Sequence, residues 1–107
     1  MTKDIIKILK ALCDENRLKI YWAISKNKLC VCEVEKSFKM SQPNATRHLQ
    51  KLRDAKLIAE EKNSPFVIYG LNNETLEKYS FLNELLSDIK DINVKLVLKD
   101  KSGICRN

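Results

Sequence analysis

Residues 41–52 read Ser-Gln-Pro-Asn-Ala-Thr-Arg-His-Leu-Gln-Lys-Leu, and this stretch decides the fold. It looks like a helix start, because Ser41 is a good capping residue and Pro43 is tolerated in a first turn, where its missing N–H has no partner. Apolar residues follow at helical spacing, at Ala45, Leu49 and Leu52. We therefore expect a helix that runs to about residue 55, with an apolar inner face and a polar outer face.

The polar face of this predicted helix carries side chains that suit DNA. Gln and Asn amides pair with adenine, Arg pairs with guanine or phosphate, and the N–H groups at a helix start bind phosphate. We predict that the residues contacting DNA are Ser41, Gln42, Asn44, Ala45, Thr46, Arg47, His48, Lys51 and, beyond the helix, Lys62. The alternative is an ordinary amphipathic surface helix. His48 is not expected to bind a metal ion, because the chain has no other histidine.

The segments on both sides of this helix complete the pattern of a winged helix-turn-helix. Helices are expected over residues 4–12, 14–26, 29–38 and 74–93 and strands over 57–62 and 66–71, with Asp14 as a cap and Asn27 as an end residue. This order, ααααββα, gives a mainly α (α+β) class in which the second helix of the motif enters the major groove. We expect one domain over residues 1–98 and a flexible tail over 99–107.

Length and composition narrow the class of protein. The chain has 107 residues, of which 44% are hydrophobic and 32% charged, so we expect one small globular domain. The longest stretch without a charged residue, 63–73, is far shorter than the roughly 20 residues that a spanning helix needs. Residues 1–4 lack the layout of a signal peptide. We expect a soluble, cytoplasmic protein with no membrane partner.

The positive charge of the chain is concentrated in two central segments and the tail. The net charge is +6, and the excess of basic over acidic residues is +4 in 17–28, +3 in 41–56 and +3 in 92–107. Such clustering is typical of a protein that binds a phosphate backbone, so we expect double-stranded DNA as the partner. Charge alone is equally compatible with a merely soluble basic surface.

The four cysteines stand at positions 13, 30, 32 and 105. Without a signal peptide, thiols kept reduced for metal or redox chemistry are favoured over disulfides. Cys30 and Cys32 begin the predicted third helix, where the helix dipole favours the thiolate, and thiolates select soft ions. Residues two apart in a regular helix point about 200° apart. We therefore expect one ion to bind both sulfurs only if the helix start unwinds; the alternative is a pair of small core residues.

Three segments together resemble the ArsR/SmtB metal-sensing repressors. Residues 9–20 (LKALCDENRLKI) resemble the opening of these proteins, residues 29–34 (LCVCEV) their metal-binding box, and residues 41–52 their recognition helix. In this order and spacing the combination is highly specific, and it covers about residues 8–71. The sequence most resembles the arsenic-responsive type.

This resemblance implies a function for the whole chain. It implies a homodimer, held by the first and last long helices, that binds operator DNA when metal-free and releases it when metal is bound. The apolar stripes of those two helices favour pairing independently, because a lone small domain offers limited core to bury them. The implied effector is As(III) or Sb(III) on Cys30 and Cys32, with Cd(II), Pb(II) and Zn(II) as further candidates. The protein is expected not to be an enzyme and to need no cofactor.

The third ligand and three other features differ from patterns found in the family. Glu35 stands where arsenic-sensing members often have a third cysteine, so Cys13, Cys105 or a solute thiol are the alternatives; Cys13 can instead be a buried small residue and Cys105 an unused thiol. Residues 74–93 contain no histidine, so the family's interface zinc site is not expected. The Ala55-Lys56 pair lacks the usual glycine, which predicts a strained or different turn. The hairpin is poor in positive charge, so strong phosphate contacts from it are not expected.

Three rival functions remain open from the sequence. A DNA-binding repressor could be switched by oxidation of its cysteines instead of by a metal ion. A thiol enzyme is disfavoured, because the Cys30–Cys32 pair has neither a strand-helix-strand context nor a nearby base. A winged-helix protein-interaction module would bind DNA with little salt dependence or not at all, whereas a DNA binder weakens steeply with salt.

Overall fold

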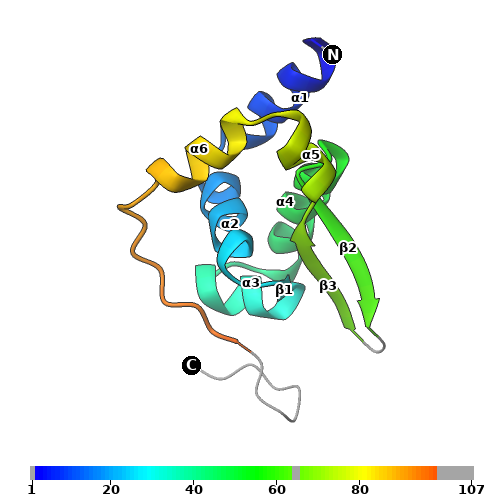
Figure 1. The fold of residues 1–107 in the computed structure, drawn as a ribbon. Helices are drawn as coiled ribbons and strands as arrows, with labels where there is room; N and C mark the ends of the chain where they lie inside the picture. The colour runs from blue at the N-terminus through cyan, green and yellow to red at the C-terminus, as the bar shows by residue number, and fades with distance from the viewer. Residues whose placement is uncertain (1, 64–65, 99–107) are drawn as a thin grey trace.

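A computed structural model describes residues 2–63 and 66–98 and shows a helical body from which a two-stranded hairpin projects (Figure 1). The helices are α1 (Thr2–Leu12), α2 (Glu15–Lys26), α3 (Val31–Phe38), α4 (Gln42–Asp54), α5 (Asn73–Lys78) and α6 (Phe81–Asp88). The strands are β1 (Leu29–Cys30), β2 (Ile58–Asn63) and β3 (Phe66–Leu71). The predicted tail over 99–107, with Cys105, lies outside the described residues. Within the described part of the chain, no helix is long and apolar enough to cross a membrane.

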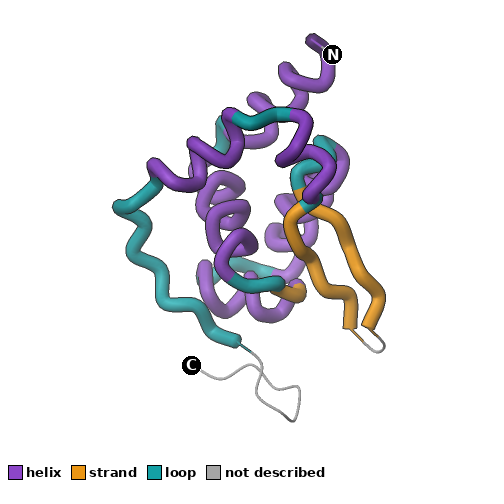
Figure 2. Tube along the Cα trace, in the orientation of Figure 1, coloured by secondary structure: helices purple, strands orange, loops and turns teal. Residues whose placement is uncertain are grey.

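The strands form one antiparallel sheet in the order β1-β3-β2 (Figure 2). The hairpin of β2 and β3, called the wing below, runs from the pair Ile58–Leu71 to the pair Asn63–Phe66. The short strand β1 is added to its other edge, where Cys30 pairs with Ile68. The two residues that lead into α3 are therefore tied to the wing, a connection that was not predicted from the sequence.

Local capping fixes the helices of the body. The side chain of Asp14 accepts a hydrogen bond from the N–H of Arg17 (3.0 Å), and that of Ser41 accepts one from the N–H of Asn44 (3.3 Å). Asn27 closes α2 at its other end, donating its N–H to a carbonyl within the helix. These caps confirm the expected boundaries, because each satisfies a backbone group that a helix end leaves without a partner.

The core lies where α1, α2 and α4 meet the base of the wing. Each of these elements contributes fully buried side chains, chief among them Ile8, Ile20, Tyr21, Leu49, Leu52, Leu57 and Ile58. Helix α3 packs against α4, so the two form the angled pair of a helix-turn-helix. The expected winged helix-turn-helix is confirmed, and its packing holds the polar face of α4 at the surface.

The prediction of a single long helix over 74–93 is wrong. The chain forms α5, breaks at Tyr79 and Ser80, and then forms the short α6. The hydroxyl of Thr75 donates to the carbonyl of Lys56 (2.5 Å), which holds α5 against the end of α4. The side-chain amide of Asn83 donates to the carbonyl of Leu76 (3.1 Å), satisfying one of the carbonyls freed at the end of α5.

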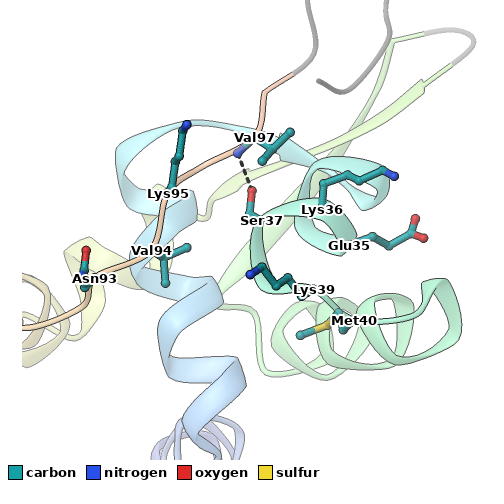
Figure 3. A pocket seen from close by; sticks show the side chains of 9 residues that line it. All are labelled: Glu35, Lys36, Ser37, Lys39, Met40, Asn93, Val94, Lys95 and Val97. Atoms are coloured by element: carbon teal, nitrogen blue, oxygen red, sulfur yellow. Dashed lines mark hydrogen bonds between the residues drawn. The ribbon is translucent and has the colours of Figure 1, made fainter. Parts of the chain in front are cut away.

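The segment 89–98 is extended and returns from α6 past α2 to α3 (Figure 1). Its end is anchored by the buried N–H of Val97, which donates to Oγ of Ser37 on α3 at 2.8 Å. Between the segment and α3 lies a groove of about 740 Å³, to which Met40 and Val94 contribute apolar surface and Lys39 and Lys95 positive charge (Figure 3). The β-branched residues of this segment disfavour helix, which accounts for its extended form.

Helix α4 ends in a left-handed turn although it has no glycine there. Lys56 has φ of 62°, the conformation that glycine usually supplies at this position. Its N–H donates to the carbonyl of Arg53 (2.8 Å) and the next N–H, of Leu57, donates to that of Leu52 (3.0 Å). Without glycine, the chain therefore makes the usual left-handed turn with a strained Lys56, and it does not form a different turn.

Candidate functional site

The two central cysteines form a close pair at the start of α3. Sγ of Cys30 lies 3.6 Å from Sγ of Cys32. Cys30 is buried, whereas Cys32 is partly exposed, so one side of the pair is open to solvent. Both side chains are thiols and not halves of a disulfide. Two adjacent sulfurs with one open side are a suitable chelate for a soft ion.

The expectation that the helix must unwind to bring these sulfurs together is wrong. Cys30 is the N-cap of α3 and has an extended backbone, with φ of −101° and ψ of 169°. Only Cys32 lies inside the helix, so the 200° separation of residues in a regular helix does not apply. The β1 pairing with β3 keeps Cys30 extended. The thiol pair is therefore preorganised by the sheet.

Glu33 is a buried acidic residue beside the thiol pair, and no role was predicted for it from the sequence. Its Oε1 accepts a hydrogen bond from the N–H of Cys30 at 2.9 Å. This is half of a capping box, in which the third helical residue reaches back to the cap. The pattern of a polar cap followed three residues later by Glu is a readable signal, but cysteine is not an ordinary capping residue. Glu33 fixes the backbone from which the Cys30 thiol projects.

A third protein ligand is not assembled among the described residues. Within 2–63 and 66–98, no cluster of three or more Cys, His, Asp or Glu side chains is close enough to hold an ion. Cys13 is exposed at the junction of α1 and α2, so it is neither the buried residue considered from the sequence nor part of such a cluster. Cys105 lies outside the described residues. The pair of Cys30 and Cys32 is thus the candidate centre.

The outer surface of α4 carries most of the predicted DNA-contacting residues. Those that the structure leaves exposed are Ser41, Gln42, Asn44, Arg47 and Lys51; Thr46 is partly exposed, and Lys62 is exposed on β2. The guanidinium of Arg47 donates through Nη2 to Oδ1 of Asn44 at 2.7 Å. A surface of amide, hydroxyl and guanidinium groups on a projecting helix is suited to the edges of bases.

Two residues predicted to contact DNA face inward instead. Ala45 is 0% exposed and His48 is 8% exposed, and both lie on the inner face of α4. Nδ1 of His48 lies 3.3 Å from Nη1 of Arg17 on α2, while Nε of Arg17 donates to the carbonyl of Ala11 at 2.7 Å. A polar residue at an inner helical position is buried when such a partner is supplied. His48 therefore contacts α2 through Arg17 and is largely shielded from solvent.

The surroundings of His48 favour its neutral form. Burial lowers the pKa of His48 below its usual value of 6.5, and this outweighs the opposing attraction of Asp14. The positive charges of Arg17, Arg47 and Lys51 lower that pKa further. The ring can then accept the hydrogen bond from Arg17 at neutral pH.

The wing pairs its acidic residues with nearby cations. Glu61 lies 3.1 Å from Nζ of Lys28, and Glu60 lies 3.1 Å from Nη1 of Arg53. Each ion pair brings together the wing and a basic residue outside it. This pairing reduces the positive charge that the wing side of α4 offers to DNA, which favours the expectation that phosphate contacts there are weak.

Comparison with known proteins identifies the family. A sequence profile described as "Bacterial regulatory protein, arsR family" matches residues 14–60. The arsenical resistance operon repressor of Staphylococcus xylosus is 35% identical over 104 residues, covering 96% of this chain and 97% of that protein. The chain belongs to the ArsR family. Its expected class, a regulatory protein and not an enzyme, agrees with this membership.

Solved structures of ArsR-family and related regulators share the fold. Reduced HlyU from Vibrio cholerae aligns with a TM-score of 0.64 and 29% identity, covering 78% of this chain and 90% of that one. The winged helix-turn-helix domain of Mb0332 from Mycobacterium bovis, described as homodimeric, aligns with a TM-score of 0.70 and 18% identity, covering 86% of this chain and 87% of that one. The second likeness concerns the fold alone, because its sequence identity is low.

Proposed function

We propose that this ArsR-family protein is a transcriptional repressor whose homodimer binds operator DNA through α4. It releases the DNA when As(III) or Sb(III) binds the thiolates of Cys30 and Cys32. The observation that carries the proposal is the 3.6 Å separation of the two sulfurs at the open start of α3. Because its proposed partner is operator DNA, we place the protein in the cytoplasm.

DNA recognition is assigned to the exposed residues of α4. Gln42 and Asn44 are suited to adenine, and Arg47 to guanine or a phosphate. The cap that Ser41 provides leaves N–H groups at the helix start available to a phosphate. Ala45 and His48 support the helix from below and are omitted from the contact surface.

Dimerisation is assigned to apolar residues that α1 and α6 leave at the surface. Ile6 is 47% exposed, Leu9 is 52% exposed and Phe81 is 38% exposed. A two-fold axis beside these helices would bury such residues against their copies, which favours a homodimer. Two copies of α4 would then face adjacent turns of the same duplex.

The effector is assigned to thiol chemistry. A thiophilic ion readily replaces the S–H protons, and the helix start favours the thiolate form. Cys30 and Cys32 supply two sulfurs without a change of fold, and a third position is completed by Cys105, by Cys13 of either subunit or by a solute thiol. Cd(II), Pb(II) and Zn(II) remain competing candidates to be tested beside arsenite.

Two contacts support coupling between the ion and DNA. Helix α3, which carries Cys32, packs against α4, and the backbone of Cys30 pairs with Ile68 of the wing. An ion that shifts the start of α3 would therefore act on the reading helix and the wing together. The start of α3 with and without the ion would then be the two-state element that allosteric release requires.

The experiment is a DNA-binding titration on the protein's own upstream DNA. Arsenite, antimonite, cadmium, lead and zinc are titrated separately into the complex, with salt dependence measured in parallel. Steep weakening with salt and release by arsenite or antimonite at near-stoichiometric concentrations are expected. Binding without salt dependence, or release by zinc alone, would contradict the proposal.

Oxidation is the second candidate signal, and the same sulfur distance favours it. A disulfide requires about 2.05 Å between sulfurs, so the pair at 3.6 Å would need to close by a modest movement. Peroxide is therefore added as a further arm, with thiols counted before and after. Release by peroxide with loss of two thiols, and none by arsenite, would support a redox repressor instead.

A further inference from the structure

A basic pocket lies beside α4, on the side away from the wing. It has a volume of about 210 Å³ and is lined by Lys7 and Lys10 of α1, Arg17 of α2, and Lys51 of α4, together with Ala11 and Asp54. The lining therefore carries four positively charged side chains and one carboxylate. These residues come from three helices, so the cluster is a product of the fold and was not apparent from the sequence.

The pocket adjoins the surface that we assign to DNA. Asn44, Arg47 and Lys51 are spaced by three and four residues and therefore share one edge of α4. The polar contact from Arg47 to Asn44 runs along this edge. Lys51 belongs to both the edge and the pocket. A duplex whose major groove holds α4 would place a phosphate strand along each side of the helix, and one strand would pass over the pocket.

The lysines of the pocket are available, unlike Lys28 and Arg53 near the wing, which pair with Glu61 and Glu60. Lys7, Lys10 and Lys51 are exposed. Among the described residues, the ion pairs within 4.0 Å involve Arg17, Lys19, Lys28 and Arg53, and none of these three lysines. Arg17 has a side chain only 13% exposed and is held by Ala11 and His48, so it forms part of the floor.

The lysine pair of α1 lies beside the apolar stripe of that helix. Lys7 and Lys10 are three residues apart and share one side, where they meet α4 in the pocket. Ile6 and Leu9, likewise three apart, form the exposed apolar stripe assigned to the dimer. A partner subunit on that stripe would lie next to Lys10, which follows Ile6 by four residues, while Lys7 lies farther round the helix, toward the pocket.

We propose that Lys7, Lys10 and Lys51 form a phosphate-binding site for the DNA backbone on the α1 side of α4. The site rests on the proposed DNA-binding function and adds α1 to the DNA-contacting surface. It adds to the backbone contacts of the wing, where Glu60 and Glu61 pair with Arg53 and Lys28 and so reduce the positive charge. Such contacts fix the register of α4 in the groove but carry no sequence information.

The test measures the salt dependence of DNA binding in charge-removing variants. Lys7→Gln/Lys10→Gln and Lys51→Gln are compared with Lys90→Gln/Lys95→Gln, a control that removes two exposed lysines from the C-terminal segment. Glutamine keeps the helix propensity of lysine, so the fold should be retained, and circular dichroism checks this. Affinity is measured for the upstream DNA and for unrelated DNA between about 0.05 and 0.2 M salt.

The site predicts a smaller salt slope in the α1 and Lys51 variants. The slope of log K against log salt should fall by about 0.9 for each phosphate that a variant no longer binds, and both DNAs should lose affinity equally. A methylphosphonate scan of the upstream DNA should then show a backbone position that matters to the wild type and not to these variants. The control should keep the wild-type slope.

Two results would overturn the site. If both pocket variants match the control in slope and in the methylphosphonate scan, the site is wrong while the proposed function stands. If the wild type itself binds neither DNA in a salt-dependent way, the site and the proposed function fail together.

Discussion

Nδ1 of His48 on α4 lies 3.3 Å from Nη1 of Arg17 on α2. A guanidinium can only donate, so Nδ1 accepts and the imidazole is neutral, with its proton on Nε2. Arg17 in turn donates to the carbonyl of Ala11 at the end of α1. Two hydrogen bonds of Arg17 therefore link α1, α2 and α4, which carries the surface that we assign to DNA. The bond to His48 depends on the protonation state of that residue.

This contact makes the stability of the protein depend on pH. The pKa of His48 is lowered by burial, so as pH falls below about 6.5 the unfolded chain takes up the proton before the folded one. Stability should therefore fall from about pH 6.5 down through the lowered pKa. We expect the melting temperature to drop between about pH 7.5 and about pH 5.5, as measured by thermal unfolding.

The matched variant is His48→Asn, whose side-chain oxygen can replace Nδ1 as an acceptor but does not titrate. Its melting temperature should change less over the same pH range. An equal drop in both proteins would mean that another group causes the pH dependence.

Replacing Lys56 with glycine should stabilise the protein. The φ of 62° at Lys56 costs an L-residue about 1–2 kcal/mol, a cost that glycine avoids. Part of this gain in stability is lost, because glycine raises the conformational entropy of the unfolded chain. We expect Lys56→Gly to raise the free energy of unfolding in urea by about 0.5–1 kcal/mol. Lys56→Ala removes the same charge but keeps the strain, so a gain of equal size in that variant would refute the backbone explanation.

Glu33 should stabilise the start of α3. Glu33→Ala leaves the buried N–H of Cys30 without its acceptor, at a cost of about 1–3 kcal/mol in urea unfolding. Glu33→Gln keeps an acceptor in the same place and should lose less. If the two variants are equally unstable, the negative charge matters and the hydrogen bond does not.

Local signals in the sequence predicted where the helices of the fold begin and which side of α4 is buried. The caps at Asp14 and Ser41 depend on residues within three positions of each helix start, so they were readable without tertiary information. The apolar spacing of α4 likewise predicted its buried side. His48 was assigned outward because it is polar, and only its distant partner, Arg17, explains why it faces inward.

The features that were not predicted from the sequence depend on contacts between segments far apart in the chain. Cys30 is extended because β1 pairs with β3, about 38 positions away, and no local pattern indicates this. The contact that anchors α5, from Thr75 to Lys56, is likewise not indicated by any local pattern. The extended segment near Val94 did carry a signal, since apolar and polar residues alternate from Ile92 to Leu96, but the apolar spacing of the preceding helix masked it.

The thiol geometry predicts how the protein responds to arsenite. Because the two sulfurs are already 3.6 Å apart outside the regular helix, ion binding requires no loss of helical turns. Saturating arsenite should release DNA while the far-UV circular dichroism stays unchanged within error. A decrease in helical signal as large as one turn would show that the helix start unwinds after all, and Cys30→Ser/Cys32→Ser is the control for non-specific effects.

The most direct test of the proposed mechanism is arsenite release of DNA measured in single cysteine variants. Cys30→Ser and Cys32→Ser should each raise the arsenite concentration for half-release by at least about tenfold, equivalent to about 1.4 kcal/mol, with DNA affinity retained without arsenite. Cys13→Ser and Cys105→Ser identify the third ligand: the one that supplies it should show a comparable effect, and neither should if a solute thiol does. Wild-type release in the Cys30→Ser/Cys32→Ser double variant would contradict the central claim.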